Sequence, residues 1–357
     1  MSRETAGQMS KQRVPGCGVS ASAQGRAGPR HRPHQSVRWR LLALVAAALF
    51  ALVGSASATS PEGGSVQLEP VISATLPILP RPGGSLYRGW DYLVARLVRE
   101  GASEAELRQI YQDERMPFFG IVTFSVKPKE SPAIYAPATS PARLALAREF
   151  LDQHRRTFAA AERELKVSRY VIAAILLVET HFGRNTGREL VINRLSRVAS
   201  VGEPNNLLLN YQRLIRLDGS VTFQQVKDRA RYLEKIFFPE ILAVLELSRR
   251  YQLDPFALKG SIAGAFGLPQ FLPTSFIRFG MDGNRNGVTS LFEPEDAIWS
   301  TGRFLSGSGW RDSGTAEEKR AVIWKYNRSE PYVDTILKIA DLLSGAGSRP
   351  SIPPKTS

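Results

Sequence analysis

A single carboxylate stands at the end of an unusually apolar stretch of the chain. Residues 171–178 read VIAAILLV, a pattern typical of a helix buried in a protein core. Helical spacing puts Ile172, Ile175 and Leu176 on the face of Glu179, so its carboxylate is expected to be partly desolvated. Desolvation raises the pKa of a carboxyl group, which lets it deliver a proton near neutral pH. Glu179 is therefore a candidate general acid; the alternative is a residue that merely ends a core helix, in water or in an ion pair.

Two polar residues, Ser261 and Gln270, lie within residues 254–276, DPFALKGSIAGAFGLPQFLPTSF. Its many Gly and Ala residues allow the backbone to approach a ligand or another helix closely. Ser261 and Gln270 add a hydroxyl and an amide, which suit sugar hydroxyls and acetamides. We interpret both as candidate ligand-binding residues. The alternative is a tightly packed helix–loop crossing without a ligand.

Residues 282–293 fit the calcium-binding loop of EF-hands. Side-chain oxygens stand at the first, third and fifth positions, a glycine at the sixth and a glutamate at the twelfth. The predicted ligands are Asp282, Asn284, Asn286, the carbonyl of Val288 and Glu293. Two of them are neutral, which lowers the charge of the site. A bound Ca²⁺ would be structural, and the alternative is an Asn/Gly-rich turn without metal.

Another group of polar residues lies near the C-terminus, where Tyr326 and Asn327 are followed by Tyr332. An asparagine amide can orient a substrate acetamide, and tyrosine rings can stack on sugar rings. The alternative is a helix start at Asn327 with packed tyrosines.

These segments together resemble the membrane-bound lytic murein transglycosylase B family. The catalytic segment of that family resembles residues 178–187, with Glu179, Thr180 and Gly183 in place, and is more loosely similar to soluble lytic transglycosylases and goose-type lysozymes. Residues 254–276 match the family pattern except at Pro269, where we expect a smaller residue. The three segments occur in the family order, and the resemblance covers roughly residues 85–343.

The resemblance implies a mostly α, lysozyme-like fold with two lobes around a glycan cleft. Ser261, Gln270 and the Tyr326–Tyr332 segment would line that cleft. The family closes its calcium loop with an acid that matches Asp296 rather than Glu293, so the closing ligand stays open.

The resemblance also implies a reaction. Glycosidases usually need two carboxylates, and no second acid matches a catalytic role. We therefore expect Glu179 to act as acid and then as base, cleaving the MurNAc–GlcNAc bond with formation of 1,6-anhydroMurNAc and without a cofactor. A lysozyme-type muramidase and a non-catalytic peptidoglycan-binding protein are the alternatives.

The N-terminus predicts export. Four arginines between positions 30 and 40 precede the apolar residues 41–53, and residues 55–58, SASA, suit signal peptidase. The apolar run is shorter than the roughly 20 residues of a permanent membrane span. We expect a periplasmic protein, with an uncleaved inner-membrane anchor as the alternative.

The composition of the chain limits the classes of molecule that it is expected to bind. The net charge of +14 suits an anionic polymer, and no nucleic-acid-binding motif is present. Cys17 is the only cysteine and precedes the apolar run, which excludes an intrachain disulfide and a lipoprotein signal. We expect a monomer that acts on peptidoglycan glycan strands, with other cell-wall enzymes as further partners.

We divide the chain into a signal peptide or anchor (1–58), a linker (59–84), a catalytic domain (85–343) and a disordered tail (344–357). Residues 115–142 are expected to be irregular, with a short β-prone stretch at 120–124. Helical periodicity predicts helices at 87–101, 103–113, 141–163, 167–180, 188–200, 204–216, 222–234, 237–250, 294–308 and 317–343.

Overall fold

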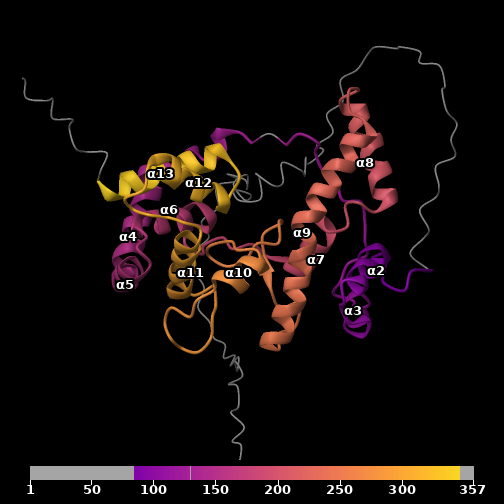
Figure 1. Cartoon of the computed structure of the whole chain (residues 1–357), viewed down its shortest axis with the longest axis horizontal. Helices are drawn as coiled ribbons and strands as arrows, with labels where there is room; N and C mark the ends of the chain where they lie inside the picture. The colour runs from indigo at the N-terminus through magenta and orange to yellow at the C-terminus, as the bar shows by residue number, and fades with distance from the viewer. Residues whose placement is uncertain (1–83, 129, 346–357) are drawn as a thin grey trace, which may run out of the picture. The chain divides into compact units, whose positions relative to one another are not determined.

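The computed structural model describes residues 84–128 and 130–345. The predicted signal or anchor, nearly all of the linker and nearly all of the tail lie outside these residues. The described part is mostly helical, as predicted (Figure 1). Its α-helices are α2 (Asp91–Arg99), α3 (Glu104–Tyr111), α4 (Pro141–Gln153), α5 (Arg155–Leu165), α6 (Arg169–Thr180), α7 (Val191–Val198), α8 (Pro204–Leu217), α9 (Phe223–Tyr251), α10 (Pro273–Phe279), α11 (Pro294–Gly307), α12 (Ala316–Tyr326) and α13 (Glu330–Ser344). Two 3₁₀ turns, η2 (Pro132–Ile134) and η3 (Ala136–Thr139), precede α4.

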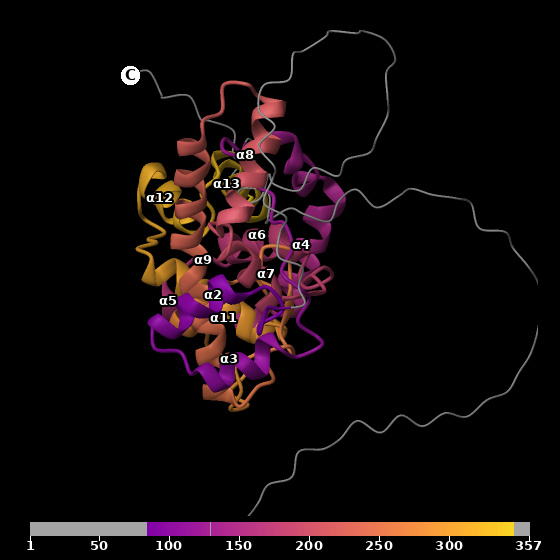
Figure 2. The ribbon, with the colours of Figure 1, turned by 90° about the vertical axis from the view of Figure 1, so that its right-hand side faces the viewer.

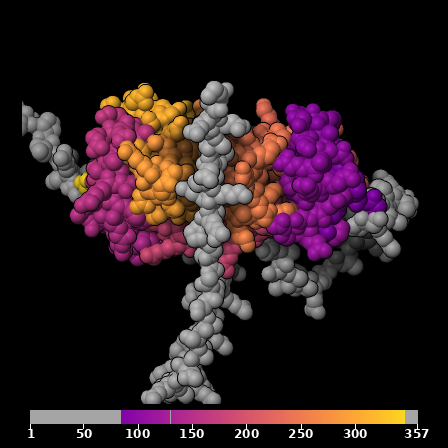
Figure 3. Space-filling view, turned by 90° about the horizontal axis from the view of Figure 1, so that it is seen from below, coloured from indigo at the N-terminus to yellow at the C-terminus, as the bar shows by residue number. Residues whose placement is uncertain are grey.

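The buried apolar side chains form two cores. The first core joins α2, α3, α7, α8, α9 and α10 with Phe304 of α11, and the second joins α4, α5, α6, α12, α13 and the rest of α11. Figures 1 and 2 show these two groups of helices from perpendicular directions. Helices α2 and α3, indigo in Figure 3, lie against α9, where Tyr92 and Arg96 both bind the carboxylate of Glu234.

Helix α6 is the central helix of the second core. Every residue from Val171 to Thr180 is buried, and the helix packs against α13, α4 and α11. Ser168 caps its N-terminus by accepting a hydrogen bond from the backbone N–H of Tyr170. His181 ends it in the left-handed conformation, with φ of 52°. The chain therefore turns away directly after Glu179 and Thr180, where the predicted acid lies.

A short antiparallel ribbon was not predicted. Strands β1 (Glu189–Leu190) and β2 (Lys259–Gly260) pair with Glu189 opposite Gly260. The ribbon joins the chain after α6 to the segment that contains Ser261. Gly187 makes this approach possible, because a Cβ atom there would lie 2.1 Å from the carbonyl oxygen of Gly260.

Two predicted helix boundaries are wrong. The helices predicted at 222–234 and 237–250 form one helix, α9, which continues through Pro239. A proline removes only one helical hydrogen bond, and the buried Phe237, Phe238 and Ile241 pack into the first core on both sides of it. The single helix predicted at 141–163 is divided at His154 into α4 and α5.

The single helix predicted at 317–343 is also wrong, and the break matters for the site. Asn327 leaves α12 in an extended conformation, and Ser329 caps α13 by accepting a hydrogen bond from the N–H of Tyr332. Pro331 in the first turn of α13 favours a helix start. The β-prone residues 120–124 form no strand. Within the described residues, no helix has the length and apolarity needed to cross a membrane.

Candidate functional site

Glu179 ends the buried face of α6. Its side chain is 6% exposed, and this burial raises the pKa of the carboxyl group well above its usual value. The hydroxyl of Tyr332 donates to Oε1 over 2.6 Å and opposes that shift only in part. The other oxygen, Oε2, is buried and has no hydrogen-bond partner among residues 84–128 and 130–345. The geometry suits a neutral carboxylic acid whose proton is free to be donated.

Three tyrosines surround this carboxyl group. The ring of Tyr332 lies edge-on to Tyr135, with centroids 5.8 Å apart, and nearly parallel to Tyr326, at 6.4 Å and 11°. Burial raises the pKa of all three phenols, and for Tyr135 a hydrogen bond to Glu130 raises it further, so all three are neutral hydrogen-bond donors. Sequence reasoning missed Tyr135, which precedes α4 in a Pro-rich segment.

The predicted stacking role is not open to Tyr332. Its ring is fully buried, so it cannot form a platform for a sugar. The break between α12 and α13 instead brings its hydroxyl to Glu179.

Thr180 connects the end of α6 to the predicted Gln270 segment. Its hydroxyl donates to the carbonyl of Leu268 over 2.8 Å and accepts from the N–H of Gly183 over 2.9 Å. The hydroxyl of Tyr326 donates to the carbonyl of Pro269. The tertiary fold therefore brings the turn at 268–270 beside the end of α6. The unexpected Pro269 keeps the carbonyl group that this contact needs.

Gln270 holds that turn together. Its side-chain amide donates to the carbonyls of Gly267, over 2.9 Å, and Thr186, over 3.2 Å. Ser261 is half-buried, and its hydroxyl accepts from the N–H of Ala265 over 3.3 Å. Both side chains support the backbone around the site, and neither has a hydrogen bond to Glu179.

Asn327 lies at the C-terminus of α12, between Tyr326 and Arg328. It is 8% exposed, and its amide nitrogen is buried without a hydrogen-bond partner in the part of the chain that the structure describes. A buried N–H₂ group without a partner is costly, so this donor suits a ligand acceptor.

In the calcium-type loop at residues 282–293, the side chains predicted as ligands lie close together. The carboxylate of Asp282 accepts from the N–H groups of Asn286, over 3.1 Å, and Gly287, over 2.8 Å. The amides of Asn284 and Asn286 both donate to Oε2 of Glu293. Side chains from the first, third, fifth and twelfth positions thus converge. The described residues contain no group of three or more acids, histidines or cysteines that could hold a metal, so a cation here would depend on the asparagines and on the carbonyl of Val288.

Asp296 accepts hydrogen bonds from the backbone of the loop. It is fully buried, and its carboxylate accepts from the N–H groups of Gly283 over 2.8 Å, Ser290 over 2.6 Å and Asn284 over 3.4 Å. These bonds tie both arms of the loop to α11. Its oxygens are already used by backbone donors, whereas Glu293 faces the asparagines.

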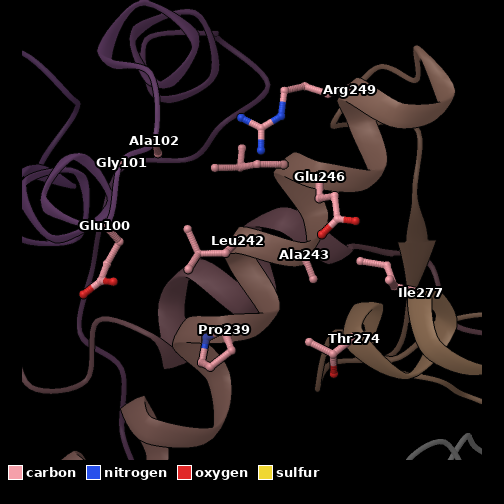
Figure 4. A pocket seen from close by; sticks show the side chains of 11 residues that line it. Glu100, Gly101, Ala102, Pro239, Leu242, Ala243, Glu246, Arg249, Thr274 and Ile277 are labelled. Carbon is pink, nitrogen blue, oxygen red and sulfur yellow. The ribbon is translucent and has the colours of Figure 1, made fainter.

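A surface hollow of about 430 Å³ lies elsewhere, among the end of α2, α9 and α10 (Figure 4). Leu242, Ala243 and Ile277 give it an apolar wall, with Glu100 and Glu246 also in its lining. It contains none of the predicted site residues.

The comparisons with known proteins concern the family and the fold of the chain. The family model for the transglycosylase SLT domain matches residues 87–320. The membrane-bound lytic murein transglycosylase B of Escherichia coli strain K12 is 32% identical over 140 residues, 39% of this chain. That match spans only 31% of the curated relative.

Solved structures share the fold. The soluble lytic transglycosylase SltB1 of Pseudomonas aeruginosa superposes with a TM-score of 0.52 at 24% identity, covering 73% of this chain and 99% of that one. The Escherichia coli lytic transglycosylase Slt35 in complex with calcium gives 0.53 at 20% identity, covering 76% and 100%. Because the family model matches more than half of the chain, the protein belongs to the transglycosylase SLT domain family.

Proposed function

We propose that this protein is a peptidoglycan lytic transglycosylase with Glu179 as its only catalytic carboxyl group. The observation that carries the proposal is the burial of Glu179, which raises its pKa, together with the unpartnered Oε2. The name of the murein transglycosylase relative supports the choice of peptidoglycan as substrate.

The reaction transfers two protons, one from Glu179 and later one back to it. Glu179 donates its proton to the oxygen that links MurNAc to GlcNAc, and the bond from the muramyl C1 to that oxygen breaks. The muramyl acetamide carbonyl stabilises the positive charge on the sugar. The ionised Glu179 then accepts the proton of the muramyl C6 hydroxyl, whose oxygen bonds to C1. The product is 1,6-anhydroMurNAc, and no water is consumed.

Among the described residues, the other buried carboxylates, Glu234, Glu240 and Asp296, are engaged in contacts elsewhere. Glu234 binds Tyr92 and Arg96, and Glu240 accepts two hydrogen bonds from Thr274. This supports one carboxyl group acting in both steps, rather than the acid and base pair of an ordinary glycosidase.

The polar groups around Glu179 have distinct proposed roles. Tyr332 orients the carboxyl group and stabilises its ionised form through the hydrogen bond to Oε1. The free amide donor of Asn327 binds the acetamide carbonyl of the substrate. Gln270, Ser261 and Tyr326 shape the glycan site through the backbone that they hold or contact.

We also propose that the 282–293 loop binds a structural Ca²⁺, with Glu293 as the closing ligand. The convergence of Glu293 with Asn284 and Asn286, whose side-chain amides both donate to its Oε2, supports this choice. The related Slt35 was solved in complex with calcium. The ion has no step in the reaction.

The remaining proposals concern place and partners. The predicted signal at residues 1–58 supports a periplasmic protein, and an inner-membrane anchor is the alternative. We propose that residues 85–343 form the catalytic domain and that it acts as a monomer on glycan strands.

Digestion of purified murein followed by mass spectrometry of the products tests the function. Wild-type protein is expected to release muropeptides with anhydro ends, whereas a muramidase would give products one water heavier. Glu179→Gln is expected to lower the rate at least about 1,000-fold while the protein still folds and binds murein. Glu317→Gln, an exposed first-turn residue of α12, is the matched control.

The outcomes separate the candidates. Hydrated products would replace the transglycosylase by a muramidase. Binding of murein without any release would favour the non-catalytic protein. Normal release by Glu179→Gln would show that another residue is the acid.

A further inference from the structure

Two arginines converge on one tyrosine where the two groups of helices face each other. Arg229 and Tyr232 are on the N-terminal half of α9, and Arg328 is in the connection between α12 and α13. Figures 1 and 2 show that connection on the side of α9. The guanidinium carbon of Arg229 is 5.2 Å from the centre of the Tyr232 ring, and Nη1 of Arg328 donates to the Tyr232 hydroxyl over 3.4 Å.

These two positive charges are not balanced by acids. Within the described residues, no carboxylate lies within 4.0 Å of either guanidinium group. The neighbouring Asp228 is taken by Arg231 and Gln224. The pair is therefore free to bind an anion.

Arg229 is also poorly solvated. Its Nε atom is buried and has no hydrogen-bond partner. Burial lowers the pKa of this guanidinium group, as expected for a charge held partly out of water without a counter-ion. A bound anion would relieve both deficits, because a guanidinium group donates two parallel hydrogen bonds to a carboxylate.

The position of Arg328 relates the pair to the catalytic carboxyl group. Arg328 follows the buried Asn327 and precedes Tyr332, whose hydroxyl binds Glu179. Glu330, the nearest acid along the chain, is paired with Arg320. The exposed guanidinium group of Arg328 thus belongs to the same short connection that brings Asn327 and Tyr332 to the candidate site.

We propose that Arg229 and Arg328, held by Tyr232, bind a carboxylate of the peptide branch on the muramyl sugar. This rests on the proposed function, since it assigns the muramyl residue to the site at Glu179. MurNAc carries its peptide on a lactyl group, and that peptide has free carboxylates. The site would make the enzyme prefer glycan strands that still carry peptides over bare strands.

Two glycan substrates test the site: murein glycan chains with their peptides, and the same chains treated with an amidase, which removes the peptide carboxylates and leaves a lactyl carboxylate. The double variant Arg229→Gln/Arg328→Gln is expected to raise KM about 10- to 100-fold on peptide-bearing chains, with kcat unchanged. On stripped chains its KM is expected to stay within about twofold of wild type. The control Lys235→Gln/Arg250→Gln removes two charges from exposed positions of α9 and should match wild type on both.

A binding measurement keeps the result independent of turnover. Calorimetry in the Glu179→Gln background compares the Kd for a peptide-bearing tetrasaccharide with that for a bare one. With both arginines present, the protein is expected to bind the peptide-bearing tetrasaccharide 10- to 100-fold more tightly than the bare one, a difference of about 1.4 to 2.8 kcal/mol. Arg229→Gln/Arg328→Gln is expected to remove this difference. Equal losses on both ligands, or no loss on either, would overturn the proposal. A wild type inactive on both substrates would refute the proposed reaction, while the Kd ratio would still decide the site.

Discussion

Removal of the Tyr332 hydroxyl group tests most directly what sets the pKa of Glu179. Tyr332→Phe keeps the buried ring and deletes one hydrogen bond, the 2.6 Å contact to Oε1. That bond favours the ionised carboxylate and is the contribution that lowers the pKa of Glu179. Without it, burial acts alone and the pKa rises further.

The size of the change follows from the charge of the acceptor. A hydrogen bond to a charged group contributes about 1.5 to 3 kcal/mol, and one pKa unit corresponds to about 1.4 kcal/mol. The pKa of Glu179 is therefore expected to rise by about 1 to 2 units. Since the reaction begins from the protonated acid, the alkaline limb of the kcat/KM profile should move up by the same amount.

Turbidity clearing of purified murein between pH 4 and pH 10 measures the limb, and mass spectrometry confirms the same anhydro products. Tyr251→Phe is the control, since Tyr251 is exposed on α9 and its hydroxyl has no hydrogen bond in the described part of the chain. An alkaline limb that stays in place, or moves to lower pH, in a folded and active Tyr332→Phe protein would refute the reasoning.

Three further substitutions test the carboxyl groups. In urea unfolding, Glu179→Gln should raise the free energy of unfolding by about 1 to 3 kcal/mol at pH 7 and leave it unchanged at pH 4. A buried acid with a raised pKa contributes its full stability below its unfolded pKa near 4.5. That contribution is lost as the pH rises towards the folded pKa. An equal effect at both pH values would contradict the raised pKa. Asp296→Ala should lower the free energy of unfolding by about 2 to 4 kcal/mol, because it leaves three backbone N–H groups without their acceptor. A loss below about 0.5 kcal/mol in urea unfolding would show that Asp296 does not hold the loop. Glu293→Gln should abolish a Ca²⁺-induced rise in Tm without changing the Tm in EGTA, and an undiminished rise would assign the closing ligand elsewhere.

The local elements follow from local chemistry. Helix α6 was predicted because eight consecutive apolar residues can be stable in water only when buried, and the carboxyl at its end is desolvated for the same reason. The loop at Asp282 was recognised because oxygen donors at alternate residues and a glycine at the sixth position are fixed by the geometry of a tight turn.

Several boundaries could not be predicted from local patterns. Periodicity cannot show that α9 continues through Pro239, because that depends on the first core receiving side chains from both sides of the proline. Nor can it show the break after Tyr326, which follows from competition between the helix and the Ser329 cap.

The catalytic arrangement itself is a tertiary property. The sequence by itself predicted that Glu179 ends a buried helix and that partial desolvation raises the pKa of its carboxyl group. Only the fold decided that Tyr332, 153 positions later, donates to Oε1, and that the buried ring cannot stack on a sugar. The same holds for Tyr135 and for the Arg229–Arg328 pair. An apolar helix indicates from the sequence alone that its residues will be buried, whereas a hydrogen-bond partner is set by the packing of elements that are distant in sequence.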